Sequence, residues 1–336
     1  MWSRPGLRRR LFLAGLAACG FSPARAEPRR FRIALADVDE TPGVTLEGLG
    51  FTGPQLRRGF ELAARTLPMD LLYYDNAGSS ARALRNAEAA IAEGIDLLIE
   101  YNADGEANAE IARKLTTAGI PAIALVYPLG NAPLYGPDNR GAGRVAGQAL
   151  GKFAIETWPA EQVVGVVIGD VAGPNPAINE RIEGITEGVH ELLPTLQFAS
   201  LDTGGQSVRA DGLLSKFLQT QHDRRVLVAT LDDLAAVYAK NAIEMNRRQS
   251  DCIIVSQGLD PNIHGTVSEK KEIDPNNRGS VVLGSVAYYM DRYGYDVLPM
   301  AMRLLAGEKL PPHTVTQHML VTASNVFREY PPFDMN

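Results

Sequence analysis

Residues 122–147 read AIALVYPLGNAPLYGPDNRGAGRVAG, and similar units repeat on either side of them. The apolar run Ala122–Val126 predicts a buried parallel strand. Tyr127-Pro128 ends it, because proline restricts the residue before it and has no N–H for a sheet. A second short extended piece ends at Pro137-Asp138-Asn139, and a helix with small residues at Gly143 and Gly147 follows. We predict that this stretch is a crossing between two α/β lobes, with a cleft beside it.

Apolar runs of strand length alternate with amphipathic stretches through both halves of the chain. The predicted strands are residues 31–38, 70–74, 96–101, 122–126, 163–168, 196–199, 226–229, 253–255, 281–287 and 315–321. Between them apolar residues follow helical spacing, as at Ile178, Ile182, Ile185 and Val189. Continuous apolar strands that alternate with amphipathic helices indicate parallel sheets covered on both faces.

Length and charge restrict the class of protein. A chain of 336 residues is long enough for two domains of ordinary size. The net charge of −6 becomes −11 without residues 1–26, which hold five arginines and no acid. A surface this acidic disfavours nucleic acid and anionic membranes.

The first 26 residues have the features of a signal peptide, which we expect to be removed from a periplasmic protein. Arg8-Arg9-Arg10 precedes an apolar run, Leu11–Phe21, that is too short to span a bilayer. Ala24-Arg25-Ala26 fits a small-x-small cleavage site.

Three types of signal remain open. One is a general secretory signal. Another is a twin-arginine signal at Arg9-Arg10, which would imply export after folding. The third is a lipobox at Leu16-Ala17-Ala18-Cys19, which would leave a lipid on Cys19 and anchor the protein.

Residue types that carry catalysis are sparse. Besides Cys19, only Cys252 occurs, within an apolar run, so no disulfide is expected. No Gly-x-Ser-x-Gly elbow is present, and the five histidines are too scattered for zinc. Asp232-Asp233 stands at a predicted helix start, where an acid caps backbone amides, with cleft contact as an added role. We expect no catalytic residue, no metal and no cofactor.

A glycine pattern supports a less favoured alternative, an NAD(P)-dependent oxidoreductase. Gly48-x-Gly50-x-x-Gly53 followed by Asp75 matches a dinucleotide-binding fingerprint. That fingerprint needs a tight strand-to-helix turn, whereas about ten residues separate Val38 from Gly48. A flexible loop is therefore the preferred interpretation, and we expect no enzyme.

Short patterns spread over nearly the whole chain after residue 26 occur in an order typical of one family. They are GPQLRRGF at 53–60, EAAI at 88–91, DLLI at 96–99, GIPA at 119–122, GRVAG at 143–147, ERIEG at 180–184 and TLDDLA at 230–235. With them the chain resembles the type I periplasmic binding proteins, the ribose- and galactose-binding group.

The resemblance implies two doubly wound parallel-sheet lobes joined by a three-segment hinge. The N-terminal lobe would comprise residues 27–137 and 289–311, and the C-terminal lobe residues 138–288 and 312–336. The crossings would lie near Pro137-Asp138, Tyr288-Tyr289 and Leu310–Pro312. Closure around a ligand would be a hinge motion, for which periplasmic binding proteins are a standard example.

The charged groups that clamp sugars in the family are mostly replaced here. The family's pentose binders place an aspartate–arginine pair at Val126 and Tyr127, an arginine near Asn179, an asparagine near Leu231, an aspartate near Gly258 and a glutamine near Tyr288. This comparison has no gaps, and a shift of one or two residues would restore some of these groups. As it stands, no buried arginine would hold a carboxylate. We therefore expect a small, mostly neutral polar ligand, a sugar or sugar-like molecule.

Polar residues at the predicted strand ends form the candidate site, because ligands of such sheets bind outside the carboxyl ends of the strands. Tyrosine adds a ring that suits a ring-shaped ligand. The predicted ligand-binding residues are Asp39, Asn102, Tyr127, Asn179, Gln257 and Tyr288.

Two roles fit this site equally well. One is a solute receptor that delivers its ligand to the membrane subunits of an ABC importer. The other is a ligand-sensing subunit for a membrane kinase or chemoreceptor. We expect a monomer that binds no nucleic acid, since no DNA-binding helix pair precedes Phe31.

Overall fold

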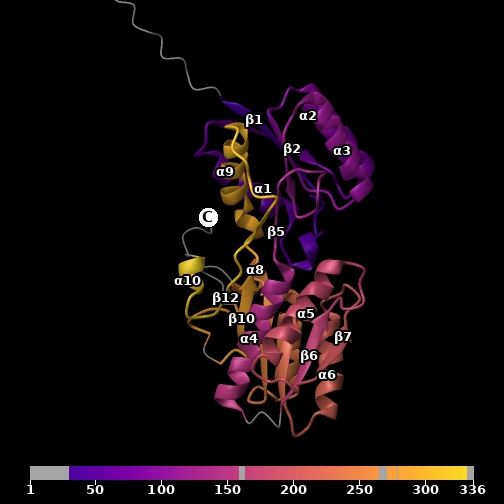
Figure 1. The fold of residues 1–336 in the computed structure, drawn as a ribbon. Coiled ribbons are helices and arrows are strands. Elements are labelled where there is room, and N and C mark those ends of the chain that lie inside the picture. Colours follow the sequence, from indigo (N-terminus) through magenta and orange to yellow (C-terminus); the bar gives the residue numbers. More distant parts are fainter. Residues whose placement is uncertain (1–29, 159–162, 265–270, 278, 331–336) are drawn as a thin grey trace, which may run out of the picture.

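Two lobes, each with a six-stranded sheet at its centre, make up the computed structural model, which describes residues 30–158, 163–264, 271–277 and 279–330 (Figure 1). The predicted α/β class with two doubly wound lobes is confirmed. The predicted signal at residues 1–26 lies outside the described residues. Within the described ranges, no helix is both long enough and apolar enough to cross a membrane.

The first sheet is parallel throughout and has the order β11-β5-β4-β3-β1-β2. Its strands are β1 (Phe31–Asp37), β2 (Met69–Asp75), β3 (Leu97–Glu100), β4 (Ala122–Leu125), β5 (Leu134–Gly136) and β11 (His313–Val315). Its helices are α1 (Gly53–Ala64), α2 (Ser80–Ala92), α3 (Gly105–Ala118) and α9 (Tyr293–Leu305), and the turn η1 (Leu46–Gly48) lies in the β1–α1 loop.

Alternation along β1 assigns the two helical layers of this lobe. Ile33 and Leu35 belong to the cluster that includes α1 and α9, whereas Ala34 and Ala36 pack with α2 and α3. Successive side chains of a strand point to opposite faces, so a fully apolar strand is covered on both sides. Figure 1 shows α2 and α3 on one side of the sheet and α1 and α9 on the other.

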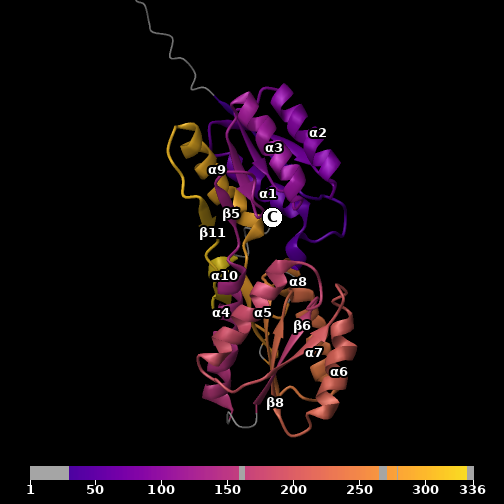
Figure 2. The same ribbon diagram turned by 45° about the vertical axis from the view of Figure 1, so that its right-hand side comes forward.

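The second sheet has the order β12-β10-β9-β8-β6-β7. Its strands are β6 (Val163–Gly169), β7 (Phe198–Asp202), β8 (Arg225–Thr230), β9 (Cys252–Gly258), β10 (Val282–Ala287) and β12 (Leu320–Val321). The helical elements of this half are α4 (Asn139–Thr157), α5 (Pro176–His190), α6 (Arg209–Thr220), α7 (Asp233–Met245), α8 (Pro261–His264) and α10 (Val326–Glu329). The turn η3 (Met290–Arg292) follows β10 and packs against α1 of the first lobe. Figure 2 shows α4 and α5 on one side of this sheet and α6 and α7 on the other.

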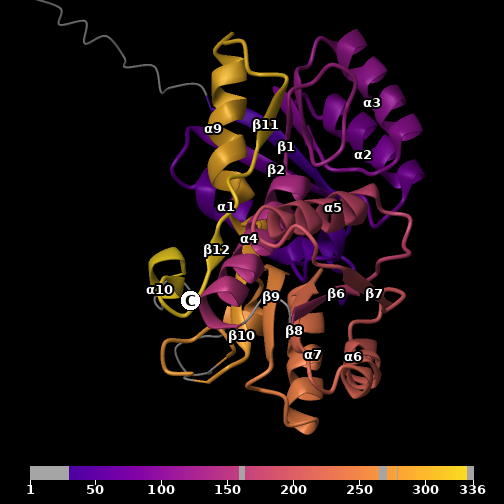
Figure 3. The same cartoon turned by 60° about the horizontal axis from the view of Figure 1, so that its bottom comes forward.

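The chain passes between the sheets after β5, after β10 and after β11. The third passage differs from the expected Leu310–Pro312, because β11 still pairs with β5 in the first sheet. It therefore lies in residues 316–319, and the single predicted strand 315–321 is two short strands in different lobes. Figure 3 shows this yellow segment running from one lobe to the other. β12 then pairs antiparallel with β10, the one exception to parallel pairing in the described sheets.

Glycines bring α4 and α5 unusually close together. A Cβ atom on Gly143 would lie 2.2 Å from the carbonyl oxygen of Arg181, and one on Gly184 would lie 2.0 Å from that of Arg140. The two helix backbones are therefore in direct contact, and this contact fixes the position of the first turns of α5.

We expect Gly184→Ala to lower the free energy of unfolding by about 1–3 kcal/mol, because the added methyl group overpacks this contact. Gly212→Ala is the matched control, since a Cβ atom at this position of α6 meets nothing within 4 Å. Alanine in a helix is favoured over glycine by about 1 kcal/mol, so the control should be at least as stable as the parent. Urea unfolding measures both. Equal stability of Gly184→Ala and the parent would contradict the backbone contact.

Candidate functional site

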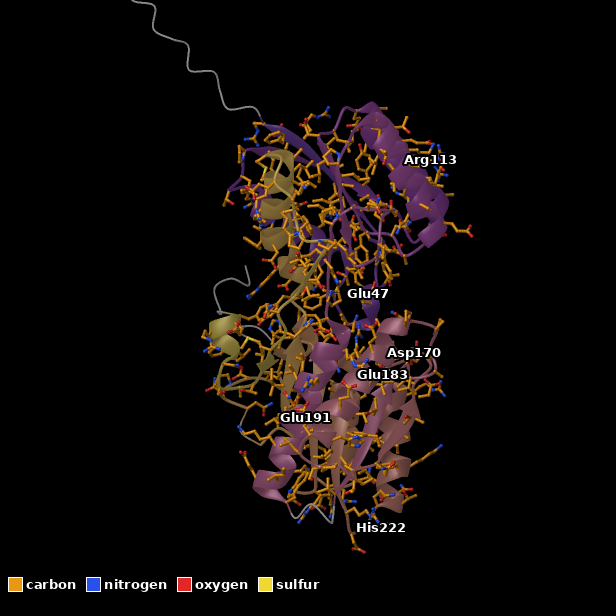
Figure 4. All side chains as sticks on the ribbon, viewed as in Figure 1. Glu47, Arg113, Asp170, Glu183, Glu191 and His222 are labelled. Carbon is orange, nitrogen blue, oxygen red and sulfur yellow. The ribbon has the colours of Figure 1, made fainter. Side chains whose placement is uncertain are left out.

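The β1–α1 loop carries an acidic side chain into the space between the lobes. Its turn η1 holds Glu47 at φ 53°, a left-handed conformation that is uncommon for a residue with a side chain. The Glu47 carboxylate accepts hydrogen bonds from the hydroxyls of Tyr101 at 2.7 Å and Tyr127 at 2.8 Å. Asn175 of the second lobe donates to it from Nδ2 at 3.4 Å. Figure 4 shows Glu47 where the two lobes meet, above Asp170.

Arg181 is the principal cation at this place. It is fully buried, because Ile178, Arg181 and Ile185 lie on the inner face of α5. Its Nε donates to Asn139 Oδ1 at 3.0 Å, and its Nη2 donates to the backbone oxygen of Glu47 at 3.2 Å. The third nitrogen, Nη1, is buried and has no hydrogen-bond partner among the described residues.

Tyr288 and Gln257 complete the group from the end of β10 and from β9. Both are fully buried, and the Tyr288 hydroxyl donates to Gln257 Oε1 at 2.8 Å. The Arg181 guanidinium lies 5.1 Å from the centre of the Tyr288 ring, within cation–π range. Gln257 Nε2 is a second buried donor without a partner in the described part of the chain. Buried donors without acceptors are rare and costly, so both are suited to oxygen atoms of a ligand.

A cavity of about 360 Å³ is lined by both lobes and meets this group at Glu47 and Asn175, whereas Arg181, Gln257 and Tyr288 are not among its lining residues. Its lining includes Glu47, Gly50, Asp170, Asn175 and Asp232. A larger hollow of about 900 Å³ lies elsewhere, against α9 and β11. We place the site beside the smaller cavity, because the β1–α1 loop of the first lobe and the strand ends of the second lobe face each other there.

Three of the six predicted site residues come together here. Tyr127 is hydrogen-bonded to Glu47. The Tyr288 ring lies against the Arg181 guanidinium, and Gln257 is hydrogen-bonded to Tyr288. The rings of Tyr101 and Tyr127 are also stacked, with their centres 6.2 Å apart.

The other three predicted residues have different surroundings. Asp39 accepts a hydrogen bond from the backbone N–H of Thr41 at 2.8 Å and so shapes the start of the β1–α1 loop. Asn102 is hydrogen-bonded to Asn108 of α3 at 2.8 Å, which joins the end of β3 to that helix. Asn179 is exposed, because two residues correspond to a turn of about 200° around α5 from Arg181.

The assumption that no buried arginine faces the cleft is wrong. Arg181 is fully buried and reaches the Glu47 turn, and it lies two residues after Asn179, within the shift of one or two residues that the ungapped comparison left open. The helical stripe that includes Ile178 and Ile185 carries the signal, because Arg181 has the same spacing. Glu47 was also missed, and no sequence pattern in the long loop indicates its position.

The predicted capping role of Asp232 is confirmed. Its carboxylate accepts from the backbone N–H of Ala235 at 2.7 Å and from the hydroxyl of Ser207 at 3.0 Å. Asp233 is buried beneath it and accepts hydrogen bonds from Ser285 and from the backbone N–H of Asp260. Among the described residues, no group of three histidine, cysteine or acidic side chains is arranged to hold a metal ion.

Buried acids at the strand ends of the first lobe resist ionisation. Burial raises the pKa of Glu100 to about 8, opposed by a hydrogen bond from Asn76 at 2.9 Å. Burial also raises the pKa of Asp37 to about 7, opposed by a hydrogen bond from the Tyr73 hydroxyl. Both native carboxyl groups therefore keep a proton at a pH where the unfolded chain has lost it.

This predicts that stability falls as the pH rises from about 4.5 to about 8, because folding takes up protons in that range. Glu100→Gln removes one such group. The free energy of unfolding of Glu100→Gln minus that of the parent should rise by about 2–4 kcal/mol between pH 5 and pH 9. Glu156→Gln is the control, since this glutamate is mostly exposed and should show no such trend. Denaturant unfolding at several pH values measures the difference, and a difference that does not change with pH would contradict the buried acid.

The chain matches the model of a known family. The family is described as periplasmic binding protein domain, and the match covers residues 51–309, more than half of the chain. A D-ribose/D-allose-binding protein of Pseudomonas aeruginosa is 25% identical over 238 residues, which are 67% of this chain and 68% of the relative.

Solved structures show the same fold. An ABC transporter periplasmic solute-binding protein from Actinobacillus succinogenes, with bound D-allose, has a TM-score of 0.67 at 16% identity. An arabinose-binding protein from Geobacillus stearothermophilus also has a TM-score of 0.67 at 16% identity. Each comparison covers 90% of this chain and 100% of the other.

Proposed function

This chain belongs to the family of periplasmic binding protein domains, and we propose that it carries a sugar or sugar-like molecule to the membrane subunits of an ABC importer. The resemblance found in the sequence is thereby confirmed, and so is the expectation that the chain is not an enzyme, because the family consists of binding proteins. The family also implies a periplasmic location. The sensor role, the monomeric state, the lipid on Cys19 and the twin-arginine signal stay predictions.

One observation carries the proposal: hydrogen-bonding groups from both lobes converge on one place. Tyr101 and Tyr127 come from the first lobe, and Asn175, Arg181 and Gln257 come from the second. A small molecule held by such a set contacts both lobes at once, so its binding favours their closed arrangement.

The chemistry of these groups supports an oxygen-rich ligand. Arg181 Nη1 and Gln257 Nε2 are donors, and tyrosine hydroxyls both donate and accept. Hydroxyl groups and a ring oxygen satisfy such a set, while tyrosine rings cover the apolar face of a sugar. The cavity of about 360 Å³ lies within the size range of small-molecule sites.

The experiment is mass spectrometry of the small molecules that heat releases from the purified, natively produced protein. We expect one polyhydroxylated compound in amounts close to one per chain. The control is the Glu308→Ala variant, whose substitution is exposed and far from the cleft, and it should release the same compound. Release of an amino acid, a peptide or a nucleotide in its place would contradict the proposed ligand class.

A further inference from the structure

We propose that Glu47 is an internal ligand: its carboxylate takes hydrogen bonds that a bound molecule would otherwise take, and it ties the two lobes together. Binding from outside then requires Glu47 to leave. The displacement half of this inference rests on the proposed function, whereas the tie between the lobes does not.

Donors from both lobes surround the Glu47 carboxylate. Tyr101 and Tyr127 donate from one lobe and Asn175 donates from the other, so a single side chain bridges the cleft. Burial and the Glu47 carboxylate raise the pKa of the Tyr127 hydroxyl, so this hydroxyl keeps the proton that it donates. A bound molecule that used these three donors would meet the oxygens of Glu47.

The backbone around Glu47 packs directly against the second lobe. The Glu47 carbonyl oxygen accepts from Arg181 Nη2 at 3.2 Å. Leu49 is fully buried, and its carbonyl oxygen would lie 2.6 Å from a Cβ atom on Gly258. At Gly50 the approach is closer still, since a Cβ atom there would lie 1.5 Å from Asp260 Oδ2. Opening the lobes must therefore withdraw the whole turn, and not only one side chain.

The turn that holds Glu47 has a strained backbone. Glu47 has a left-handed backbone at φ 53°, a conformation that is unfavourable for a non-glycine residue and persists only where its surroundings enforce it. The enforcing contacts are those with Tyr101, Tyr127, Asn175 and Arg181. A ligand that takes over these contacts would also release the strain.

Only some classes of molecule can displace Glu47. The incoming molecule must present acceptor oxygens to two tyrosine hydroxyls and to the Asn175 amide. It gains a further partner in Arg181 Nη1, which Glu47 leaves without an acceptor. Polyhydroxylated molecules meet this requirement, and purely cationic or apolar molecules do not.

The tie between the lobes is tested without any added ligand, by double electron–electron resonance, which measures the distance between two spin labels. The labels are attached at Thr117→Cys in α3 and Gln219→Cys in α6, both exposed positions. Cys252 is buried and should escape labelling, and Cys19 is replaced by serine in every labelled chain. We expect one narrow distance in the otherwise unchanged chain and a longer, broader distribution in Glu47→Ala. Glu308→Ala is the control and should keep the narrow distance. A Glu47→Ala distribution equal to that of the control would overturn the inference.

The displacement is tested by calorimetric titration with D-allose, the sugar bound to one of the structural relatives. Removal of a competing internal ligand raises the fraction of binding-competent protein, so Glu47→Ala should bind D-allose about tenfold more tightly than the parent. Weaker binding by Glu47→Ala would overturn the inference, since Glu47 would then hold the sugar. The two failures can be told apart: D-allose binding with unchanged distances contradicts the internal ligand alone. Changed distances without sugar binding in any variant contradict the proposed function and leave the tie intact.

Discussion

Arg181→Met should bind the compound that heat releases from the purified protein about tenfold to hundredfold more weakly than the parent does. Methionine keeps most of the apolar stem but removes every donor of the guanidinium. A hydrogen bond to a charged group contributes about 1.5–3 kcal/mol, which corresponds to that loss in affinity. Arg181 is fully buried with Nη1 directed at no protein acceptor within the described residues, so the effect should fall on binding.

Stability separates this effect from misfolding. Arg181→Met also leaves Asn139 Oδ1 and the Glu47 carbonyl oxygen without their donor, which should lower the free energy of unfolding by about 1–3 kcal/mol. The variant should therefore still unfold cooperatively, at a lower denaturant concentration than the parent, while it binds weakly. Asn179→Ala is the matched control, because it lies on the same helix but faces outward, and it should bind like the parent. Calorimetric titration of the three proteins decides the matter. Parent-like affinity in Arg181→Met would remove Arg181 from the site.

Tyr288→Ala should destabilise the protein by about 3–5 kcal/mol and abolish measurable binding. The side chain is fully buried at the second passage between the lobes, and truncation of large buried aromatic residues has costs of this size. It would also remove the ring beneath Arg181 and the hydroxyl that holds Gln257.

Tyr288→Phe divides these contributions. Phenylalanine keeps the ring and the cation–π contact but leaves Gln257 Oε1 without its hydrogen bond from the hydroxyl. Loss of one buried partner costs about 1–3 kcal/mol. We expect Tyr288→Phe to lie between the parent and Tyr288→Ala in both unfolding free energy and affinity. Two variants that behave alike would show that the ring has no role beyond the hydroxyl.

The fold could be predicted because it depends on local periodicity. Fully apolar strands such as Val163–Gly169 and stripes such as that of α5 specify parallel sheets under helices without any knowledge of distant contacts. The hinge was harder, since β11 is three residues long and its place in the first sheet depends on pairing with β5. Nothing in so short a segment indicates which of two sheets it joins.

The site could be predicted only where a residue directly ends a strand. Gln257 lies in β9 near its end and Tyr288 follows β10, so the rule for strand ends found both. Asn102 satisfies the same rule, but its side chain is hydrogen-bonded to Asn108 of α3, a contact that depends on tertiary packing. Arg181 lies within a helix, and Glu47 lies in a long loop whose course depends on contacts with the other lobe. Their roles follow from the docking of the two lobes and not from local sequence.

The claim that a ligand binds between the lobes is tested most directly by a crystal structure of the protein with the molecule that it retains on purification. We predict ligand oxygens within hydrogen-bond distance of Arg181 Nη1 and Gln257 Nε2, with Tyr127 of the other lobe also in contact. A ligand found in the hollow against α9 and β11, with Arg181 and Gln257 left without it, would contradict the account.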